Sequence, residues 1–367
     1  MFGFRVSGFG KKGIGSIGRI DRICLIALIV PLPVRTLAAP SADEVHLAAL
    51  ARHDQMDGAV ARGLAYLVQK QDPSGHFSKD MPNVHTALSC MALMSAGQIP
   101  GRSRYGENLR KGIMYLVDAS KSGKGYFGRE GNARMYGHGI CTLALCEAYG
   151  MMQDEGENRL VKEAIERAVK IILASQSKHK GPHHGGWRYE PRPGDADLSV
   201  TAWQVLALRA AQNCRLRVPA HAVTDAMNYV RRTYHAGSKG FTYQAGSSSA
   251  SAAMRSAGTV CMLALGSTHE GKDAEMLNGS AAFLLTAKPG TGRYFYYQSY
   301  YLATAANMMG KRQRSFLLPK MEKALLNLQM PSGEFRKHTG AHGGVYSTAF
   351  GVICLSVRYQ YLPIYQE

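Results

Sequence analysis

Apolar positions along the chain form two kinds of helical segment. One kind is amphipathic and carries the charged residues, as in 158–176, whereas the other is apolar or small on nearly every side, as in 198–211. The two kinds alternate six times. The amphipathic segments are predicted at 58–70, 108–118, 158–176, 221–234, 273–287 and 316–329, and the apolar segments at 83–96, 137–149, 198–211, 250–265, 297–309 and 345–359.

A short turn with a glycine before an aromatic residue joins the two helices of each pair. Its two closest copies are Gln71–Phe77 (QDPSGHF) and Gln329–Phe335 (QMPSGEF), near opposite ends of the chain. Glycine allows the positive φ that a tight turn needs. We expect the aromatic side chain to pack over the junction, and the glutamine amide to bond open carbonyls at a helix end.

The repeat predicts the fold. A helix that is apolar on all sides must be buried on all sides, so six such pairs form either an open solenoid or a closed ring. The first and last units share the closest motif, and neither end carries a polar capping unit. The sequence therefore predicts an all-α (α/α)6 toroid of six helical hairpins and twelve helices, with the apolar helices inside.

The N-terminus has the pattern of an export signal. Basic residues precede the apolar run 23–30, and small residues follow at 36–39. The run is too short to span a bilayer, which takes about 20 residues. We therefore predict a signal peptide at 1–39, with an uncleaved anchor as the alternative, a polar lead-in at 40–57 and one domain at 58–367. The predicted location is periplasmic or extracellular, without a permanent membrane span after cleavage.

The chain is basic, with a formal charge of +18. Residues 1–39 carry six Lys or Arg and one Asp, which leaves 38 basic and 25 acidic residues, a charge of +13. An anionic component of the cell envelope is a possible partner, and a solvated basic surface is the alternative. Export argues against nucleic acid. The six cysteines beyond the signal show no CxxC, so we interpret them as buried small hydrophobic residues, with one pair meeting across helices left open.

The Gln-x-x-x-Gly-x-Phe/Trp repeats between paired helices resemble the prenyltransferase and squalene-oxidase repeat family. Its members include squalene and hopene cyclases and the β-subunits of protein prenyltransferases. The resemblance covers 58–360, is specific for the toroid fold and says less about activity. The segments 135–150, 197–208 and 361–366 resemble exported, single-domain bacterial members.

The chain departs from the acidic motif of the triterpene cyclases, Asp-x-Asp-Asp-Thr-Ala. Thr201-Ala202 matches its end and Asp197 its first position, but Ser199 and Val200 replace the two central acids. A serine hydroxyl is too weak an acid to protonate an alkene. Asp197 stays a candidate catalytic residue, with a helix cap as the alternative.

The chain also lacks the residues that other reactions hosted by this fold require. Prenyltransferases bind zinc with an Asp-x-Cys pair and a distant His, and the chain contains no Asp-x-Cys, so we predict no metal and no cofactor. Glycoside hydrolysis needs two facing carboxylates, and the inner helices offer only Asp197 and Glu147.

In a closed ring the first turns of the inner helices meet at one mouth. Their aromatic and hydroxyl side chains suit an apolar or isoprenoid-like ligand with one polar end, whereas the alternative is that they fill the ring completely. His138, between two glycines, is a second catalytic candidate, with a structural role as the alternative. The predicted lining is His85, Thr86, Tyr136, His138, Ser199, Thr201, Trp203, Tyr297, Ser299, Tyr300, Tyr346 and Thr348.

A separate cluster of basic and histidine side chains lies in the third turn, at 178–188. It is a candidate phosphate or metal site, and a solvated loop is the alternative. Two functions remain open from the sequence. One is an enzyme that acts on an isoprenoid or lipid-like substrate, and the other is a non-catalytic binding or scaffold protein of the cell envelope.

Overall fold

The computed structural model describes residues 42–129, 134–192, 194–290 and 294–365, with side chains from residue 53 to residue 364. The predicted signal peptide lies outside these residues. Contacts divide the chain into two units, Met1–Leu47 and Ala48–Glu367. The second unit holds all of the helices described below except the first residues of α1.

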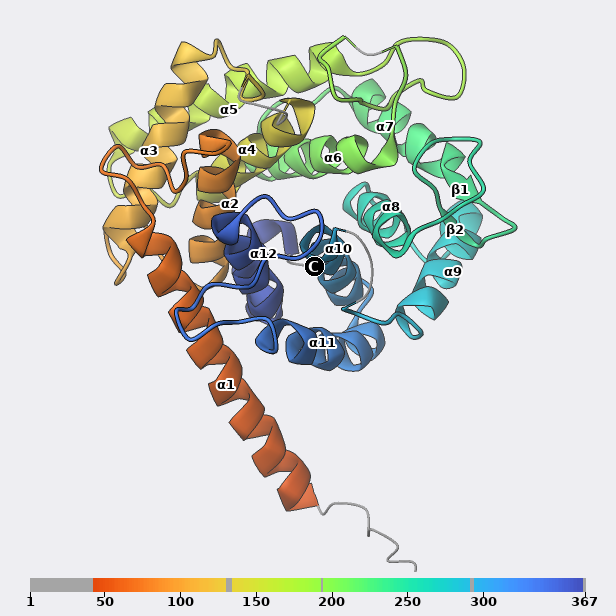
Figure 1. Cartoon of the computed structure of the whole chain (residues 1–367). Helices are drawn as coiled ribbons and strands as arrows, with labels where there is room; N and C mark the ends of the chain where they lie inside the picture. Colours follow the sequence, from red (N-terminus) through yellow and green to blue (C-terminus); the bar gives the residue numbers. More distant parts are fainter. Residues whose placement is uncertain (1–41, 130–133, 193, 291–293, 366–367) are drawn as a thin grey trace, which may run out of the picture. The chain divides into compact units, whose positions relative to one another are not determined.

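Within residues 48–367, six apolar helices form a closed inner ring (Figure 1). Each contacts the next inner helix along the chain, and the last contacts the first. Every described side chain of α12 from Val345 onward is buried, because the helix is packed on all sides. The inner helices are α2 (Pro82–Ser95), α4 (Arg134–Ala148), α6 (Leu198–Asn213), α8 (Ala252–Ala264), α10 (Phe295–Met308) and α12 (Gly344–Ser356).

The amphipathic helices lie outside this ring. In α5, Val161, Ile165, Ala168 and Ile172 form a buried stripe at helical spacing, and charged residues occupy the opposite side. The predicted all-α toroid is therefore confirmed. The outer helices are α1 (Ala42–Gln69), α3 (Gly106–Ser122), α5 (Glu155–Ser175), α7 (Ala220–Arg232), α9 (Ala274–Leu284) and α11 (Lys311–Leu326).

The structure differs from the predicted elements in three details. The first helix begins at residue 42, so the described part of the predicted polar lead-in, residues 42–57, is helical. The fourth turn holds two short antiparallel strands, β1 (Tyr234–His235) and β2 (Gly240–Phe241), that the sequence pattern did not predict. Three short 3-10 helices were also not predicted: η1 (Gly271–Asp273), η2 (Val357–Tyr359) and η3 (Pro363–Tyr365).

The glutamines of the turn motif link successive hairpins, a role that differs from the predicted bond to open carbonyls at a helix end. The side-chain Nε2 of Gln71, Gln176 and Gln329 donates to the carbonyl of the glycine in its own turn and to a carbonyl of the next outer helix. For Gln329 the next outer helix is α1, so this side chain closes the ring. The acceptors are Gly75 and Asn108, Gly185 and Ala222, and Gly333 and Ala59, respectively, at 2.8–3.2 Å.

The motif glycines let neighbouring backbones touch. Gly185 and Gly333 have φ of 84° and 87°, and a Cβ on them would lie 2.1 Å from the Asp225 carbonyl oxygen and 2.2 Å from that of Arg62. No side chain fits there without a backbone shift. The aromatic residues that follow pack over their junctions, as predicted, at Phe77, Phe127, Trp187, Phe241 and Phe335.

The fifth turn is an exception. Tyr294 was predicted to pack over its junction, but it is 48% exposed and adopts a left-handed backbone conformation directly before α10. Its amide donates to the Thr339 carbonyl at 2.9 Å, which holds the turn against the loop before α12. The aromatic side chain of Tyr294 therefore lies at the mouth of the helical ring instead of over the junction of its hairpin.

The six described cysteines are free thiols, and all but Cys214 are buried. The Cys214 thiol donates to the Cys146 carbonyl at 3.2 Å, so this pair meets across α4 and α6. In the part of the chain that the structure describes, every helix is too short or too polar to cross a membrane.

Candidate functional site

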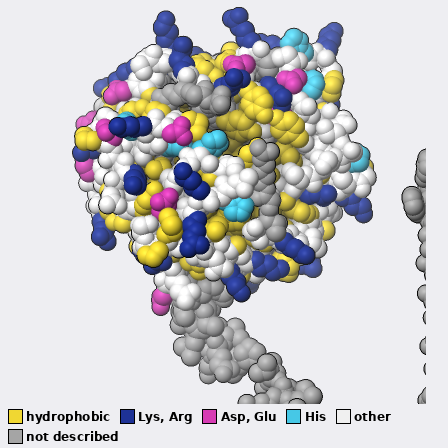
Figure 2. Space-filling view, viewed as in Figure 1, with side chains coloured by type: hydrophobic (Ala, Val, Ile, Leu, Met, Phe, Trp, Pro, Cys, Tyr) yellow, Lys and Arg dark blue, Asp and Glu magenta, His cyan; other side chains and the backbone are white. Residues whose placement is uncertain are grey.

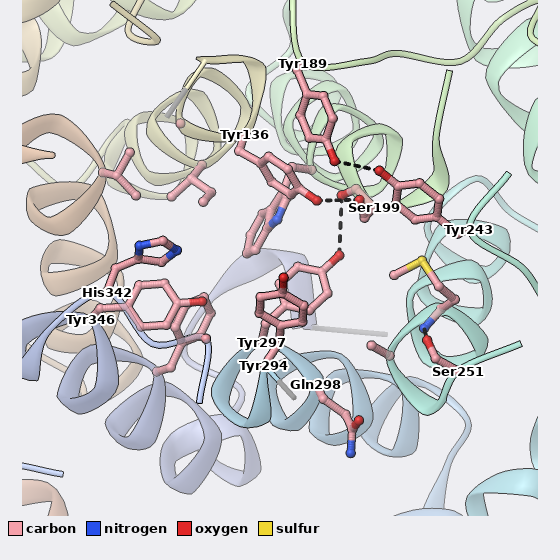
Figure 3. Close-up of a pocket in the computed structure, with 18 of the residues that line it drawn as sticks. Tyr136, Tyr189, Ser199, Tyr243, Ser251, Tyr294, Tyr297, Gln298, His342 and Tyr346 are labelled. Carbon is pink, nitrogen blue, oxygen red and sulfur yellow. Dashed lines mark hydrogen bonds between the residues drawn. The ribbon is translucent and has the colours of Figure 1, made fainter. Parts of the chain in front are cut away.

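A cavity of about 840 Å³ opens where the inner helices begin. Figure 2 shows hydrophobic side chains gathered on this face of the molecule, and Figure 3 shows the labelled side chains converging from several helices on one space. All six inner helices, or the residue directly before them, contribute. The described lining is Met81, Val84, Tyr136, Gly137, Ile140, Tyr189, Ser199, Trp203, Tyr243, Ser247, Ser249, Ser251, Ala253, Met254, Tyr294, Tyr297, Gln298, Gly340, His342, Tyr346 and Phe350.

The predicted convergence of the helix starts is therefore present, and the ring is not completely filled by side chains. Five of the twelve predicted lining residues line the cavity: Tyr136, Ser199, Trp203, Tyr297 and Tyr346. The other seven lie outside the described lining, which corrects their predicted place: His85, Thr86, His138, Thr201, Ser299, Tyr300 and Thr348.

Three of these seven have a shared structural role. The hydroxyls of Thr86, Thr201 and Thr348 accept the backbone N–H of the motif aromatic at 3.2, 3.0 and 3.0 Å. Each threonine stands near the start of its inner helix and is followed by an alanine, and there it ties the turn to the helix. Each bond contributes about 1 kcal/mol of net stability. The aromatic partners are Phe77, Trp187 and Phe335, respectively.

His138 takes the place of this threonine in the second hairpin. Its Nδ1 accepts the Phe127 N–H at 3.4 Å, so Nε2 carries the proton and donates to the Ala168 carbonyl at 3.0 Å. Burial lowers the pKa of His138 to about 4, which keeps the ring neutral. Both ring nitrogens are thus used within the fold. A catalytic role for His138 stays a prediction, and the structural role is the one the geometry supports.

Asp197 caps α6 and lies behind the cavity wall. Its Oδ1 accepts from the Val200 N–H at 2.9 Å and the Ser199 hydroxyl at 2.5 Å, and its Oδ2 lies 2.8 Å from Arg188 Nη1. Burial raises the pKa of the carboxyl, and these partners oppose the rise. The predicted helix cap is confirmed. A catalytic role for Asp197 stays a prediction, since the carboxyl is linked to the cavity wall through Ser199 and through Arg188, which donates to the Tyr243 hydroxyl at 2.8 Å.

Four hydroxyl groups of the wall bond to one another in pairs. Tyr136 is hydrogen-bonded to Ser199, and the Tyr189 and Tyr243 hydroxyls lie 2.6 Å apart (Figure 3). The Tyr297 hydroxyl donates to the Ser199 carbonyl at 3.4 Å. Burial raises the pKa of Tyr136 and Tyr297, so both phenols stay neutral.

Aromatic rings form much of the remaining wall. Trp203 stacks on Tyr300 with ring centroids 5.0 Å apart and planes 16° apart, and Tyr346 meets Phe350 edge to face at 4.8 Å. Several wall residues the sequence analysis missed stand four positions after another lining residue, one helical turn deeper into the ring. They are Ile140, Gln298 and Phe350.

The basic and histidine cluster at 178–188 is partly used by the fold. His183 Nδ1 accepts the Ala196 N–H at 3.2 Å, and His184 lies 3.4 Å from Asp225. Among the described residues no three His, Cys, Asp or Glu side chains are placed to hold a metal ion together. Arg188 pairs with Asp197 and Asp195, at 2.8 and 3.3 Å.

Comparisons with known proteins identify the fold. No family model matches the chain, and no curated protein matches its sequence. Solved structures do match. The GH76A α-1,6-mannanase from Salegentibacter sp. HEL1_6 aligns over 83% of this chain and 99% of its own, with a TM-score of 0.61 and 10% identity.

Two further structures align over similar lengths. A possible member of the GH105 family from Salmonella enterica covers 83% of this chain and 93% of its own, with a TM-score of 0.57 and 13% identity. The type II terpene cyclase MstE from Scytonema covers 84% and 99%, with a TM-score of 0.51 and 14% identity. At these identities the similarity is one of fold, and the chain shares the α/α toroid of these proteins.

Proposed function

We propose that this protein, outside the cytoplasm, binds an isoprenoid or similar lipid-like molecule in its central cavity. The observation that carries the proposal is the composition of the wall: aromatic rings border the space, and four of its hydroxyls bond to one another in the pairs Tyr136–Ser199 and Tyr189–Tyr243. Such a surface gains little from a ligand rich in hydroxyl groups and much from an apolar one. A cavity of about 840 Å³ is within the usual size of small-molecule sites.

The uncharged character of the described wall supports binding without hydrolysis. The described lining contains no carboxylate, ammonium or guanidinium group, and His342 is its one imidazole. Hydrolysis of a glycosidic bond needs two carboxylates at the scissile bond. The two candidate catalytic residues are engaged in structural hydrogen bonds. We therefore favour a non-catalytic binding protein over an enzyme.

Two further observations favour an isoprenoid. The turn repeats resemble those of a family that contains isoprenoid-converting proteins, and the fold is shared with a type II terpene cyclase. Extraction of the purified protein with organic solvent, followed by mass spectrometry, tests the class directly. We expect a co-purified isoprenoid or lipid in near-stoichiometric amount, and sugars or only solvent in the extract would contradict the proposal.

Ala253→Phe should block the cavity. Ala253 lines it from the first turn of α8, whereas the adjacent Ala252 does not, although both are partly exposed. A phenyl ring at 253 occupies space that the ligand needs. We expect binding of the C15 hydrocarbon farnesene to weaken at least about tenfold, measured by equilibrium partition. The matched variant Ala252→Phe should stay within about twofold of the native affinity, and equal losses in the two variants would place the ligand elsewhere.

A further inference from the structure

Two cysteines from different hairpins meet where two inner helices end. Cys146 lies near the end of α4, and Cys214 directly follows the last residue of α6, 68 residues further along the chain. The Cys214 thiol donates to the Cys146 carbonyl at 3.2 Å, and the two thiols are also close enough to hydrogen-bond to each other. The cavity opens where these helices begin, and neither cysteine belongs to its described lining.

The two thiols differ in the way that formation of a disulfide requires. Cys214 is the only described cysteine that is not buried, and it follows α6 as a cap residue, so its side chain has room to turn toward the Cys146 sulfur. The Cys146 thiol lowers the pKa of Cys214 by hydrogen bonding, whereas burial raises the pKa of Cys146. An accessible thiolate attacks an oxidant first, and a buried neighbour then completes the bond.

Three other cysteines have no such neighbour. Burial alone raises the pKa of Cys90, Cys261 and Cys354, and no second thiol contributes to the rise. A buried thiol of this kind packs as a small hydrophobic residue and is chemically inert. The chain thus combines accessibility and a thiol neighbour at Cys214.

We propose that Cys146 and Cys214 form a disulfide bond when the protein meets a disulfide oxidant. The Cys214 thiolate attacks one sulfur of the oxidant, whose S–S bond breaks, so that a mixed disulfide forms and one thiol group is released. The Cys146 thiol then loses its proton and attacks the Cys214 sulfur, which releases the second thiol group of the oxidant. The two electrons pass to the oxidant, which is a disulfide-bonded oxidoreductase or glutathione disulfide.

The inference depends on the location in the proposed function and not on the ligand, because such bonds form and persist outside the cytoplasm. The bond would join two inner helices that are in contact around the ring. A cross-link between positions 68 residues apart restricts mainly the unfolded chain. We therefore expect the oxidised protein to unfold at a temperature about 4–8 °C higher than the reduced protein.

Alkylation and mass spectrometry test the pairing. The purified full-length protein is treated with glutathione disulfide, unfolded and alkylated with iodoacetamide. We expect two fewer alkylated cysteines than in the reduced protein, and a cross-linked pair of peptides that contains Cys146 and Cys214. Cys214→Ser should abolish the cross-link, whereas the matched variant Cys141→Ser, on the same helix as Cys146, should keep it. An unchanged thiol count, a stable glutathione adduct on Cys214 or a bond through another cysteine would overturn the proposal.

A second measurement on the native sequence does not depend on the folding of a variant. Thermal unfolding of the oxidised and reduced forms, followed by circular dichroism, should show the expected difference, and equal midpoints would contradict a cross-link between the two helices. A bacterial host that exports the chain should yield protein in which the bond is already formed. Protein isolated with both thiols free, although glutathione disulfide joins them in vitro, would contradict the location outside the cytoplasm and leave the pairing itself standing.

Discussion

Gly333→Ala should lower the free energy of unfolding by about 3–5 kcal/mol, whereas Gly150→Ala should lower it by only about 1–2 kcal/mol. The two glycines have nearly the same positive φ, 87° and 85°. Their surroundings differ. A Cβ at 333 would lie 2.2 Å from the Arg62 carbonyl oxygen, and a Cβ at 150 meets nothing within 4 Å. Both variants carry the strain of a left-handed alanine, but only the first must also move a backbone.

The comparison tests ring closure. Gly333 belongs to the turn between α11 and α12, and Arg62 belongs to α1, so their contact joins the last hairpin to the first helix. Gln329 strengthens the same junction through its bond to the Ala59 carbonyl. Urea denaturation followed by circular dichroism gives both free energies. Similar losses for the two variants would mean that the ends of the ring are not packed together in solution.

The sequence specifies this ring because its repeat determines both where the chain turns between helices and which faces of the helices are buried. Chargeless segments such as α12 have no side that tolerates water, and the paired motifs with Gln71 and Gln329 recur at the two ends that must meet. Burial and turn geometry are local properties, so they can be predicted from the chain alone.

The cavity was less predictable because position in a helix does not fix the direction of a side chain. Thr86, His138, Thr201 and Thr348 all stand at the start of their helices, but each turns outward to accept an N–H of the motif turn. The sequence did contain a signal for this structural role. These residues stand at equivalent positions of four inner helices, and a polar atom at one repeated position indicates a repeated structural bond.

Loop residues were missed for a different reason. Tyr189 and Tyr243 lie outside the helices, and their place in the wall depends on the hydroxyl bond between them and on Arg188, whose guanidinium lies over both rings at 4.6 and 5.5 Å. The contacts of Tyr243 with Tyr189 and Arg188 join segments more than 50 residues apart in the chain. No local pattern encodes them.

Glu147 should make the protein less stable as the pH rises. The side chain is 3% exposed near the end of α4, and its Oε2 accepts the Ile364 N–H at 3.3 Å. Burial raises the pKa of Glu147 from 4.5 to about 8; the bond from Ile364 lowers it and nearby Cys214 adds to the rise. Between these two pKa values the folded protein holds a proton on Glu147 that the unfolded chain has lost. The contribution of Glu147 to stability is therefore greatest below pH 4.5 and decreases as the pH rises to about 8.

The expected loss between pH 5 and pH 8 is about 3–4 kcal/mol from this group alone. Glu147→Gln keeps the size and polarity of the neutral acid but cannot ionise, so it should remove this loss and be the more stable form at pH 8. Glu166→Gln, on the exposed side of α5, should retain the native pH profile. Urea denaturation of the three proteins at each pH separates Glu147 from the nearby thiols, which all three share. Parallel profiles for the native protein and Glu147→Gln would show that this carboxyl reaches water and titrates normally.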